Sequence, residues 1–156
     1  MVHAVGADEV TLADVHKGSG RRWTACGKLW CLDHEYLPVW GEMVPLEAAQ
    51  WGRVFEEVGA EQWPALCAWV ESGSHVVEGD GPIPSISDFE ERYAGQWDSF
   101  QEYAEDLADQ VGLTGGWPKT AQRYFDCTGW ARDLAYDHVV CEAPGPEYGV
   151  YVFRSL

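Results

Sequence analysis

The chain has 156 residues, of which 26 are acidic and 10 basic, and it carries a formal net charge of −16. Nine tryptophans and a hydrophobic share of 46% exclude a disordered acidic tail, because so much apolar surface predicts a packed core. The negative charge argues against direct binding to DNA, RNA or an anionic membrane, since phosphate groups repel carboxylates.

The sequence also lacks the features of membrane and secreted proteins. The sequence contains no run of about 18 apolar residues, so no transmembrane helix is predicted. The first ten residues lack the basic flank and apolar run of a signal peptide. The cysteines are odd in number and scattered, which favours reduced thiols in a cytoplasmic protein. They are Cys26, Cys31, Cys67, Cys127 and Cys141.

Residues 1–45 are predicted to form a small N-terminal subdomain that contains a sheet. Val10–Val15 and part of Trp23–Val39 are the candidate strands. Lys17–Arg22 lies between them as a flexible turn and holds a local cluster of positive charge. The periodicity here is poor, so the pattern indicates strands without fixing their ends.

Residues 46–80 are predicted to form a helical middle subdomain. A first helix begins at Pro45 and ends before Gly59, and its apolar face is formed by Trp51, Val54, Phe55 and Val58. A second helix begins near Glu61 and directs inward Trp63, Leu66, Cys67 and Val70. Ser72–Pro84 is rich in Gly, Pro and Ser and is typical of a linker.

Residues 81–156 are predicted to form an acidic helical subdomain. Ser87–Glu90 is a capping box for a short helix that is expected to end at Gly95. Ser99–Glu102 is a second capping box, and it begins the clearest helix of the chain, which Gly112 closes.

The chain is then predicted to end in a β-hairpin. A short helix capped by Asp126 or Thr128 precedes two strands, which are His138–Glu142 and Tyr148–Phe153. The fold class expected from these elements is α+β, an elongated chain of small subdomains with a mostly helical middle and C-terminal part.

The negative charge is concentrated in the middle of the sequence. Residues 54–112 contain fourteen acidic residues and one base, Arg92, a net charge of −13. In the helix after Ser99, acids recur at i, i+3, i+4 and i+7 with no lysine among them, although like charges four residues apart destabilise a helix by about 0.2–0.5 kcal/mol per pair. This pattern fits either a merely solvated acidic face or a functional row of anions.

A row of anions on folded helices can imitate DNA. Carboxylates at this spacing lie about 5–6 Å apart, and B-DNA carries a negative charge about every 1.7 Å of its axis. A protein groove that binds DNA would attract such a surface. The candidate residues are Glu56, Glu57, Glu61, Glu71, Glu90, Glu91, Asp98, Glu102, Glu105, Asp106 and Asp109.

Several short blocks of the sequence are similar to those of one known family. The central blocks are Phe89–Phe100 and Glu102–Ala108. Further blocks follow or precede them in the order expected, namely Phe55–Gly59, Ala68–Val70, Tyr124–Asp126, Trp130–Leu134 and Val152–Arg154. Together they resemble the ArdA antirestriction proteins, with the two central blocks similar to the core of that family, and the likeness spans about residues 46–156.

The resemblance implies an elongated acidic homodimer, joined through its C-terminal part, whose acids follow the course of the phosphates of a bent duplex. It implies a non-enzymatic inhibitor that binds type I restriction–modification enzymes in place of DNA and so protects incoming phage or plasmid DNA. An inhibitor of another DNA-binding defence protein would have a similar sequence.

The alternative is a small acidic intracellular adaptor or a zinc-stabilised module. Cys26, Cys31 and His34, with His16 as a fourth ligand, suggest zinc, but the spacing is loose and a second ligand pair is missing. Buried thiols are the default expectation, and no cofactor or metal is predicted.

No catalytic motif is recognised, and we expect no enzyme. A GxSxG elbow and a phosphate-binding GxxxxGK[ST] loop are both missing. His138 and Cys141 are the Cys/His pair considered for catalysis, and residues three apart in a strand face opposite ways.

The tryptophans and two arginines have two interpretations each. Core positions are expected for Trp51, Trp63, Trp69 and Trp130, whereas loop-like positions suggest interface roles for Trp40, Trp97 and Trp117. Arg123 and Arg132 either pair with nearby acids or hold a dimer interface.

Overall fold

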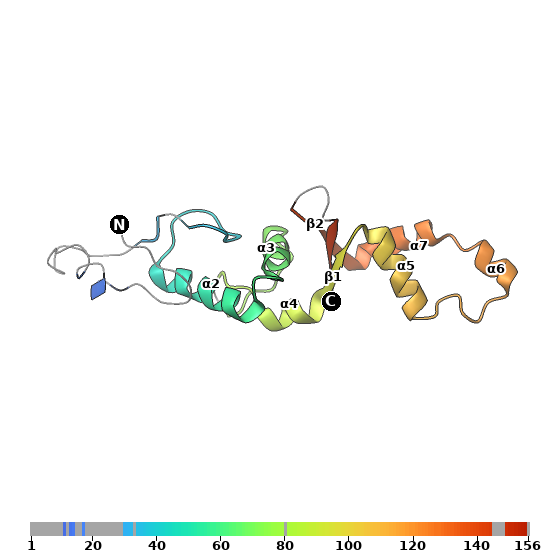
Figure 1. The fold of residues 1–156 in the computed structure, drawn as a ribbon, viewed down its shortest axis with the longest axis horizontal. Helices are drawn as coiled ribbons and strands as arrows, with labels where there is room; N and C mark the ends of the chain where they lie inside the picture. Colours follow the sequence, from blue (N-terminus) through green and yellow to red (C-terminus); the bar gives the residue numbers. More distant parts are fainter. Residues whose placement is uncertain are drawn as a thin grey trace. The chain divides into compact units, whose positions relative to one another are not determined.

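The structure is a computed structural model, which describes residues 11, 13–14, 17, 30–32, 34–79, 81–144 and 149–155 (Figure 1). The turn Lys17–Arg22 and the first part of Trp23–Val39 lie largely outside these residues. Within Val10–Val15, Ala13 and Asp14 are helical, so the predicted strand is wrong there. The reason is local, because the Thr11 N–H and hydroxyl both donate to Asp14 Oδ2, at 2.9 and 2.6 Å, which closes a helical turn.

The chain divides into two compact units. The first comprises residues 1–63 and 76–86, and the second comprises residues 64–75 and 87–156. The predicted subdomain boundaries at residues 45 and 80 stay a prediction. Helices and a small antiparallel sheet are both present, which confirms the α+β class.

Helix α2 (Pro45–Val58) dominates the described part of the first unit. Its first residue is a proline, and it ends before Gly59, which has a positive φ of 81° and whose N–H donates to the Phe55 carbonyl. Trp51 is fully buried, and its ring meets Trp63 edge-on at 6.4 Å between centroids. Both predicted helix ends are therefore confirmed.

The segment Ser72–Pro84, expected to be a linker, folds back on itself. Val77 and Pro84 form an antiparallel bridge, flanked by hydrogen bonds from the Glu78 N–H to the Ile83 carbonyl and from the Ser85 N–H to the Val76 carbonyl, both 2.8 Å. Ile83 and Pro84 are buried, so this segment is packed turn structure with an apolar anchor.

The second unit is built on a three-stranded antiparallel sheet in the order β1-β3-β2. Strand β3 (Val150–Arg154) lies in the centre, between β1 (Tyr93–Trp97) and β2 (His138–Glu142). The predicted C-terminal hairpin is confirmed by the pairing of β2 with β3. Its loop, residues 145–148, lies outside the described residues.

Strand β1 is the main correction to the sequence prediction. Helix α4 (Ile86–Arg92) does not continue to Gly95 but ends at Arg92, and the strand follows at once. Gly95 has a φ of 104° and lies where the β1–β3 register shifts. The glycine therefore serves a strand irregularity rather than a helix end.

The core of the second unit is aromatic. Trp69 from α3 (Trp63–Glu71), Phe89 from α4 and Phe153 from β3 are all fully buried. Trp69 stacks on Phe153 with ring centroids 5.8 Å apart, and Phe89 stacks on Tyr93 at 5.2 Å. These contacts join α3, α4 and the sheet.

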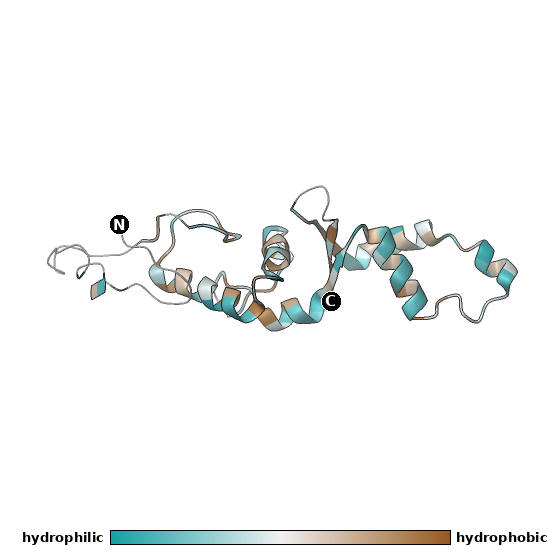
Figure 2. Cartoon of the chain, viewed as in Figure 1, coloured by the Kyte–Doolittle hydropathy of each residue, from teal (hydrophilic) through white to brown (hydrophobic). Residues whose placement is uncertain are grey.

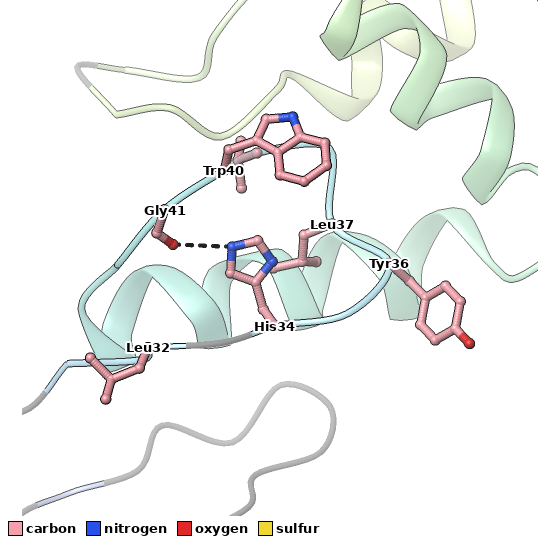
Figure 3. A pocket seen from close by; sticks show the side chains of 7 residues that line it. Leu32, His34, Tyr36, Leu37, Trp40 and Gly41 are labelled. Atoms are coloured by element: carbon pink, nitrogen blue, oxygen red, sulfur yellow. Dashed lines mark hydrogen bonds between the residues drawn. The ribbon is translucent and has the colours of Figure 1, made fainter.

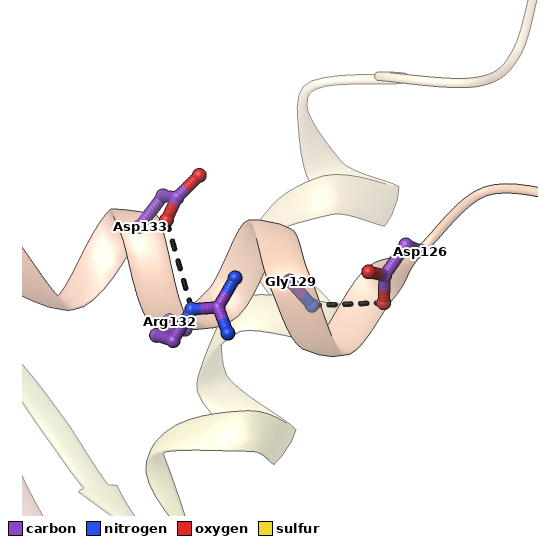
Figure 4. Close-up of polar contacts among 4 residues, drawn as sticks. All are labelled: Asp126, Gly129, Arg132 and Asp133. Atoms are coloured by element: carbon purple, nitrogen blue, oxygen red, sulfur yellow. Dashed lines mark hydrogen bonds and ion pairs between the residues drawn. The ribbon is translucent and has the colours of Figure 1, made fainter.

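Four further elements complete this unit. They are α5 (Phe100–Gln110), α6 (Lys119–Arg123), α7 (Cys127–Leu134) and the 3₁₀ turn η2 (Ala135–Asp137). The Ser99 Oγ accepts the Glu102 N–H at 3.2 Å, which confirms the second capping box. Asp126, rather than Thr128, caps α7 by accepting the Gly129 N–H at 2.9 Å (Figure 4).

No helix among the described residues is long and apolar enough to cross a membrane.

Candidate acidic interaction surface

Ten of the eleven predicted acids have exposed side chains, and Asp106 is half-buried. Three belong to the first unit, namely Glu56, Glu57 and Glu61, and eight to the second, namely Glu71, Glu90, Glu91, Asp98, Glu102, Glu105, Asp106 and Asp109. The helices carry these acids outward because their apolar faces are buried. A carboxylate outside the core keeps its charge and its reach toward a partner.

Two of the three acids of the first unit lie where a helix tolerates them poorly. Glu56 and Glu57 occupy the last turn of α2, and Glu61 lies in the turn before α3. The C-terminal end of a helix carries partial negative charge, which favours lysine or arginine over glutamate. The last turn of α2 has no basic residue, so its composition does not serve helix stability.

Helix α5 carries the densest row. This one helix carries four of the acids, namely Glu102, Glu105, Asp106 and Asp109. Its buried residues are Tyr103, Ala104 and Ala108. Figure 2 shows hydrophilic and hydrophobic residues alternating along it. Glu102 Oε2 also accepts the Asp98 N–H at 3.0 Å. This bond holds the Glu102 carboxylate next to the backbone of Asp98, which is itself one of the eleven acids.

Two glutamine amides hydrogen-bond to the row without neutralising it. Gln101 Nε2 donates to Glu105 Oε1 at 2.7 Å, and Gln110 Nε2 donates to Asp106 Oδ2. Both pairs are four residues apart, a spacing at which polar pairs stabilise a helix by about 0.2–0.5 kcal/mol. They offset part of the repulsion between the carboxylates and leave the negative charge in place.

None of the eleven acids takes part in an ion pair within the described part of the chain. The two ion pairs found there join Arg92 to Asp88 at 3.8 Å and Arg132 to Asp133 at 3.9 Å (Figure 4). Arg132 therefore pairs with a local acid, one of its two predicted roles, while the eleven carboxylates remain available to external cations.

The negative charges of α5 affect a thiol at the start of α7. Burial raises the pKa of the Cys127 thiol, and the charges of Glu105 and Asp109 raise it further. Gln101 Nε2 lies 3.7 Å from Cys127 Sγ and opposes the effect. Part of the acidic row thus lies beside the N-terminal end of α7, whose partial positive charge favours carboxylates.

Glu71 has a similar influence on two other thiols. Burial, with a smaller contribution from Glu71, raises the pKa of Cys67 to about 12. Burial also raises the pKa of Cys141, which a hydrogen bond to Ser72 lowers and the charge of Glu71 raises. Thiols with raised pKa values are poor nucleophiles and poor metal ligands.

His138 and Cys141 have separate surroundings, as their spacing predicts. The His138 ring contacts Phe100 and Tyr103 from α5, whereas Cys141 lies near Ser72 and Glu71. The two side chains therefore do not form a nucleophile–base pair.

The candidate zinc ligands are only partly described. Cys26 and His16 lie outside the described residues, Cys31 pairs with Met43 through backbone hydrogen bonds, and His34 Nε2 lies 3.2 Å from the Gly41 carbonyl. Among the residues that the structure describes, no group of three or more His, Cys, Asp or Glu side chains could hold a metal. A pocket lined by seven residues has His34 among them (Figure 3). The others are Leu32, Tyr36, Leu37, Val39, Trp40 and Gly41.

The tryptophans divide largely as the pattern predicts. Trp51, Trp63 and Trp69 are buried, Trp130 is half-buried, and Trp40 and Trp117 are exposed. Trp97 is the exception. It lies in β1 rather than in a loop, its Nε1–H donates to the Ala94 carbonyl at 3.0 Å, and its ring contacts Tyr103.

A comparison with protein families decides the relationship of this acidic chain. The model of the antirestriction protein ArdA matches residues 6–145. The chain belongs to the ArdA family. The ArdA match starts at residue 6 and thus includes most of residues 1–45, which the resemblance by blocks does not cover. No curated protein and no solved structure matches the chain.

Membership of the ArdA family indicates the general function of this protein. The protein is an antirestriction protein, and this family consists of inhibitors of restriction rather than enzymes. The ArdA family also indicates an interaction with restriction enzymes.

Proposed function

We propose that this ArdA protein is a DNA mimic that occupies the DNA-binding groove of a type I restriction–modification enzyme, or of a related DNA-binding defence complex. By filling that groove it would protect incoming phage or plasmid DNA. Glu102, Glu105, Asp106 and Asp109 on α5, with Asp98, form the most closely spaced part of the proposed contact.

The observation that carries the proposal is a set of eleven carboxylates, ten of them exposed and Asp106 half-buried, without a cation of the described chain paired to any of them. A protein that uses surface acids only for solubility gains from interspersed lysines, which relieve repulsion at a fixed fold. A groove that binds a phosphate backbone offers the missing cations from outside and attracts this surface over several ångströms.

Binding of this kind is collective. One exposed ion pair contributes about 0–1 kcal/mol, so no single acid is expected to determine the affinity. Many weak ion pairs acting together make the affinity depend strongly on salt, because each contact between a carboxylate and a cation of the target releases counterions. We further propose a homodimer joined through its C-terminal part, which doubles the number of acids presented to one target.

The test is competition for the enzyme. Fluorescently labelled duplex DNA is bound to a purified type I restriction–modification enzyme, and the protein is titrated in while anisotropy is followed. The proposal expects stoichiometric displacement of the duplex, with an apparent affinity that falls steeply as salt rises.

Two outcomes would contradict the proposal. One is binding to the enzyme with no loss of bound DNA, which is the behaviour of an adaptor that contacts another face. The other is no binding at all to any DNA-binding defence enzyme, including enzymes of other restriction types.

A further inference from the structure

The proposed function leaves one exposed feature of the first unit unused, the loop from Cys31 to Met43. Two backbone hydrogen bonds between these residues, at 2.8 and 3.2 Å, close its neck. Between them, Tyr36 is 86% exposed and Trp40 is 95% exposed. Isolated apolar side chains are common on surfaces, but two large aromatic rings standing in solvent on one closed loop are a candidate contact surface.

The loop backbone is held to the folded unit rather than merely extended into solvent. The Nε1–H of the buried Trp63 donates to the Tyr36 carbonyl at 2.8 Å. Across the loop, His34 Nε2 lies 3.2 Å from the Gly41 carbonyl (Figure 3). Pro38 and Met43 are buried. The two rings therefore project from a backbone that is fixed at several points, which lowers the entropic cost of contact.

Tyr36 also has an unusual backbone. Its φ of 64° is the one positive value at a non-glycine position in the described part of the chain. An L-residue with a side chain adopts this region only when the surrounding contacts impose it, and such residues concentrate at functional sites. In Figure 3 Tyr36 and Trp40 lie on opposite limbs of the loop, and both belong to the residues that line the pocket.

The charges around the rings define the kind of partner. Glu35 precedes Tyr36 and Glu42 follows the Trp40–Gly41 pair, and both glutamates are exposed. No Lys or Arg occurs between residues 30 and 44. An exposed aromatic ring on a loop that carries a carboxylate on each side in the sequence resembles a nucleobase between two phosphates. Its complement is an apolar slot bordered by cations, which is how proteins hold an unstacked base.

We propose that the Cys31–Met43 loop presents Trp40 as an imitation of an unstacked base to the base-binding pocket of the target enzyme. Glu35 and Glu42 stand for the flanking phosphates, and Tyr36 packs against the rim. This inference rests on the proposed function, because it takes the same DNA-binding enzyme as its partner. Enzymes that modify a base flip it into such a pocket, so the modification subunit is the part of the target addressed.

The first experiment measures affinity and its salt dependence with the full chain and a type I restriction–modification enzyme. Trp40→Ala is expected to weaken binding about tenfold or more, which is typical of losing one stacked ring, and Tyr36→Ala to weaken it less. The slope of log affinity against log salt should stay that of the parent, because no charge is removed. Tyr136→Ala removes a ring of nearly equal exposure, 84%, from the second unit and should leave the affinity unchanged.

The second experiment locates the contact. An enzyme variant in which the aromatic side chain that stacks on the flipped base is changed to alanine is combined with Trp40→Ala in a double-mutant cycle. The expected result is that Trp40→Ala causes little further loss on this enzyme. Additive losses would overturn the assignment to the base pocket.

The outcomes separate this inference from the proposed function. If the parent displaces duplex DNA while Trp40→Ala and Tyr36→Ala bind as tightly as the parent, the loop proposal is wrong and the mimic proposal stands. If the parent fails to displace DNA, the mimic proposal itself is wrong. Because both rings are exposed, the variants are expected to fold, which circular dichroism and thermal unfolding verify.

Discussion

The hydroxyl of Tyr103 and Nε2 of His138 lie 3.0 Å apart, and this hydrogen bond joins helix α5 to strand β2. His138 Nδ1 lies 2.9 Å from the Leu134 carbonyl, which can only accept, so Nδ1 carries the hydrogen and Nε2 accepts from Tyr103. The helix that carries the densest acidic row is therefore attached to the sheet by a buried tyrosine on its opposite side.

Removing the hydroxyl should loosen this attachment. Tyr103→Phe is expected to lower the free energy of unfolding by about 1 kcal/mol, because His138 Nε2 loses its donor in a partly buried site. Urea unfolding followed by circular dichroism measures it. Tyr136→Phe changes an exposed tyrosine in η2 and should have no measurable effect. Equal stabilities of the Tyr103→Phe variant and the parent would show that this bond contributes nothing net.

Stability should fall at alkaline pH through Cys67. Its pKa is raised from 9.0 to about 12 in the folded chain, so the folded state retains a proton that the unfolded state releases above about pH 9. The contribution of Cys67 to the free energy of unfolding is complete below about pH 9 and is lost as the pH rises toward 12. We expect the urea midpoint under reducing conditions to fall more between about pH 8 and 10.5 in the parent than in Cys67→Ala. Parallel pH profiles for the two proteins would contradict this expectation.

The acidic row of α5 should control association with the target. Replacing Glu102, Glu105, Asp106 and Asp109 together by Gln or Asn is expected to slow association and to reduce the salt dependence of binding, because attraction between opposite charges sets the encounter rate. Each single replacement should be nearly silent. Stopped-flow or surface-based kinetics with the restriction enzyme measure both effects.

A matched variant separates position from net charge. Glu78, Asp133, Asp137 and Glu142 are four exposed acids outside the proposed surface, and their neutralisation changes the net charge by the same amount. This control should associate nearly as fast as the parent. If the two quadruple variants behave alike, total charge matters and the row on α5 has no special role.

Gly149 should tolerate no side chain. Its φ is 70°, and a Cβ atom built there would lie 2.0 Å from the Trp97 carbonyl oxygen of β1, so Gly149→Ala must push β1 away from the start of β3. We expect a loss of roughly 2–4 kcal/mol in the free energy of unfolding. Gly116→Ala introduces a methyl group into open space and should change stability by less than about 0.5 kcal/mol. Thermal unfolding of the two variants gives the comparison, and a stable Gly149→Ala variant would mean that β1 and β3 pair differently.

Helices were the most predictable part of this fold. Pro45 and Gly59 mark the ends of α2, Ser99 marks the start of α5 and Asp126 marks the start of α7. These signals are local, because a cap or a proline acts within one helical turn of its own position.

Strand β1 was not predictable in the same way. Tyr93–Trp97 follows a helix directly, and the glycine within it matches a helix end as well as a bulge. What makes it a strand is β3, whose residues 150–154 lie more than fifty positions later in the chain. A pairing at that separation leaves no periodic trace in a single sequence.

The sequence by itself determined the charge of this protein, the exposed and buried faces of its helices and its family, because composition, spacing and short blocks are properties of neighbouring residues. Only the tertiary structure decided that β3 lies between β1 and β2, that Trp97 packs on Tyr103, and that Tyr36 and Trp40 stand in solvent on a loop closed by Cys31 and Met43. Each of these depends on contacts between residues distant in sequence or on a backbone conformation that such contacts impose, and local preference carries no information about either.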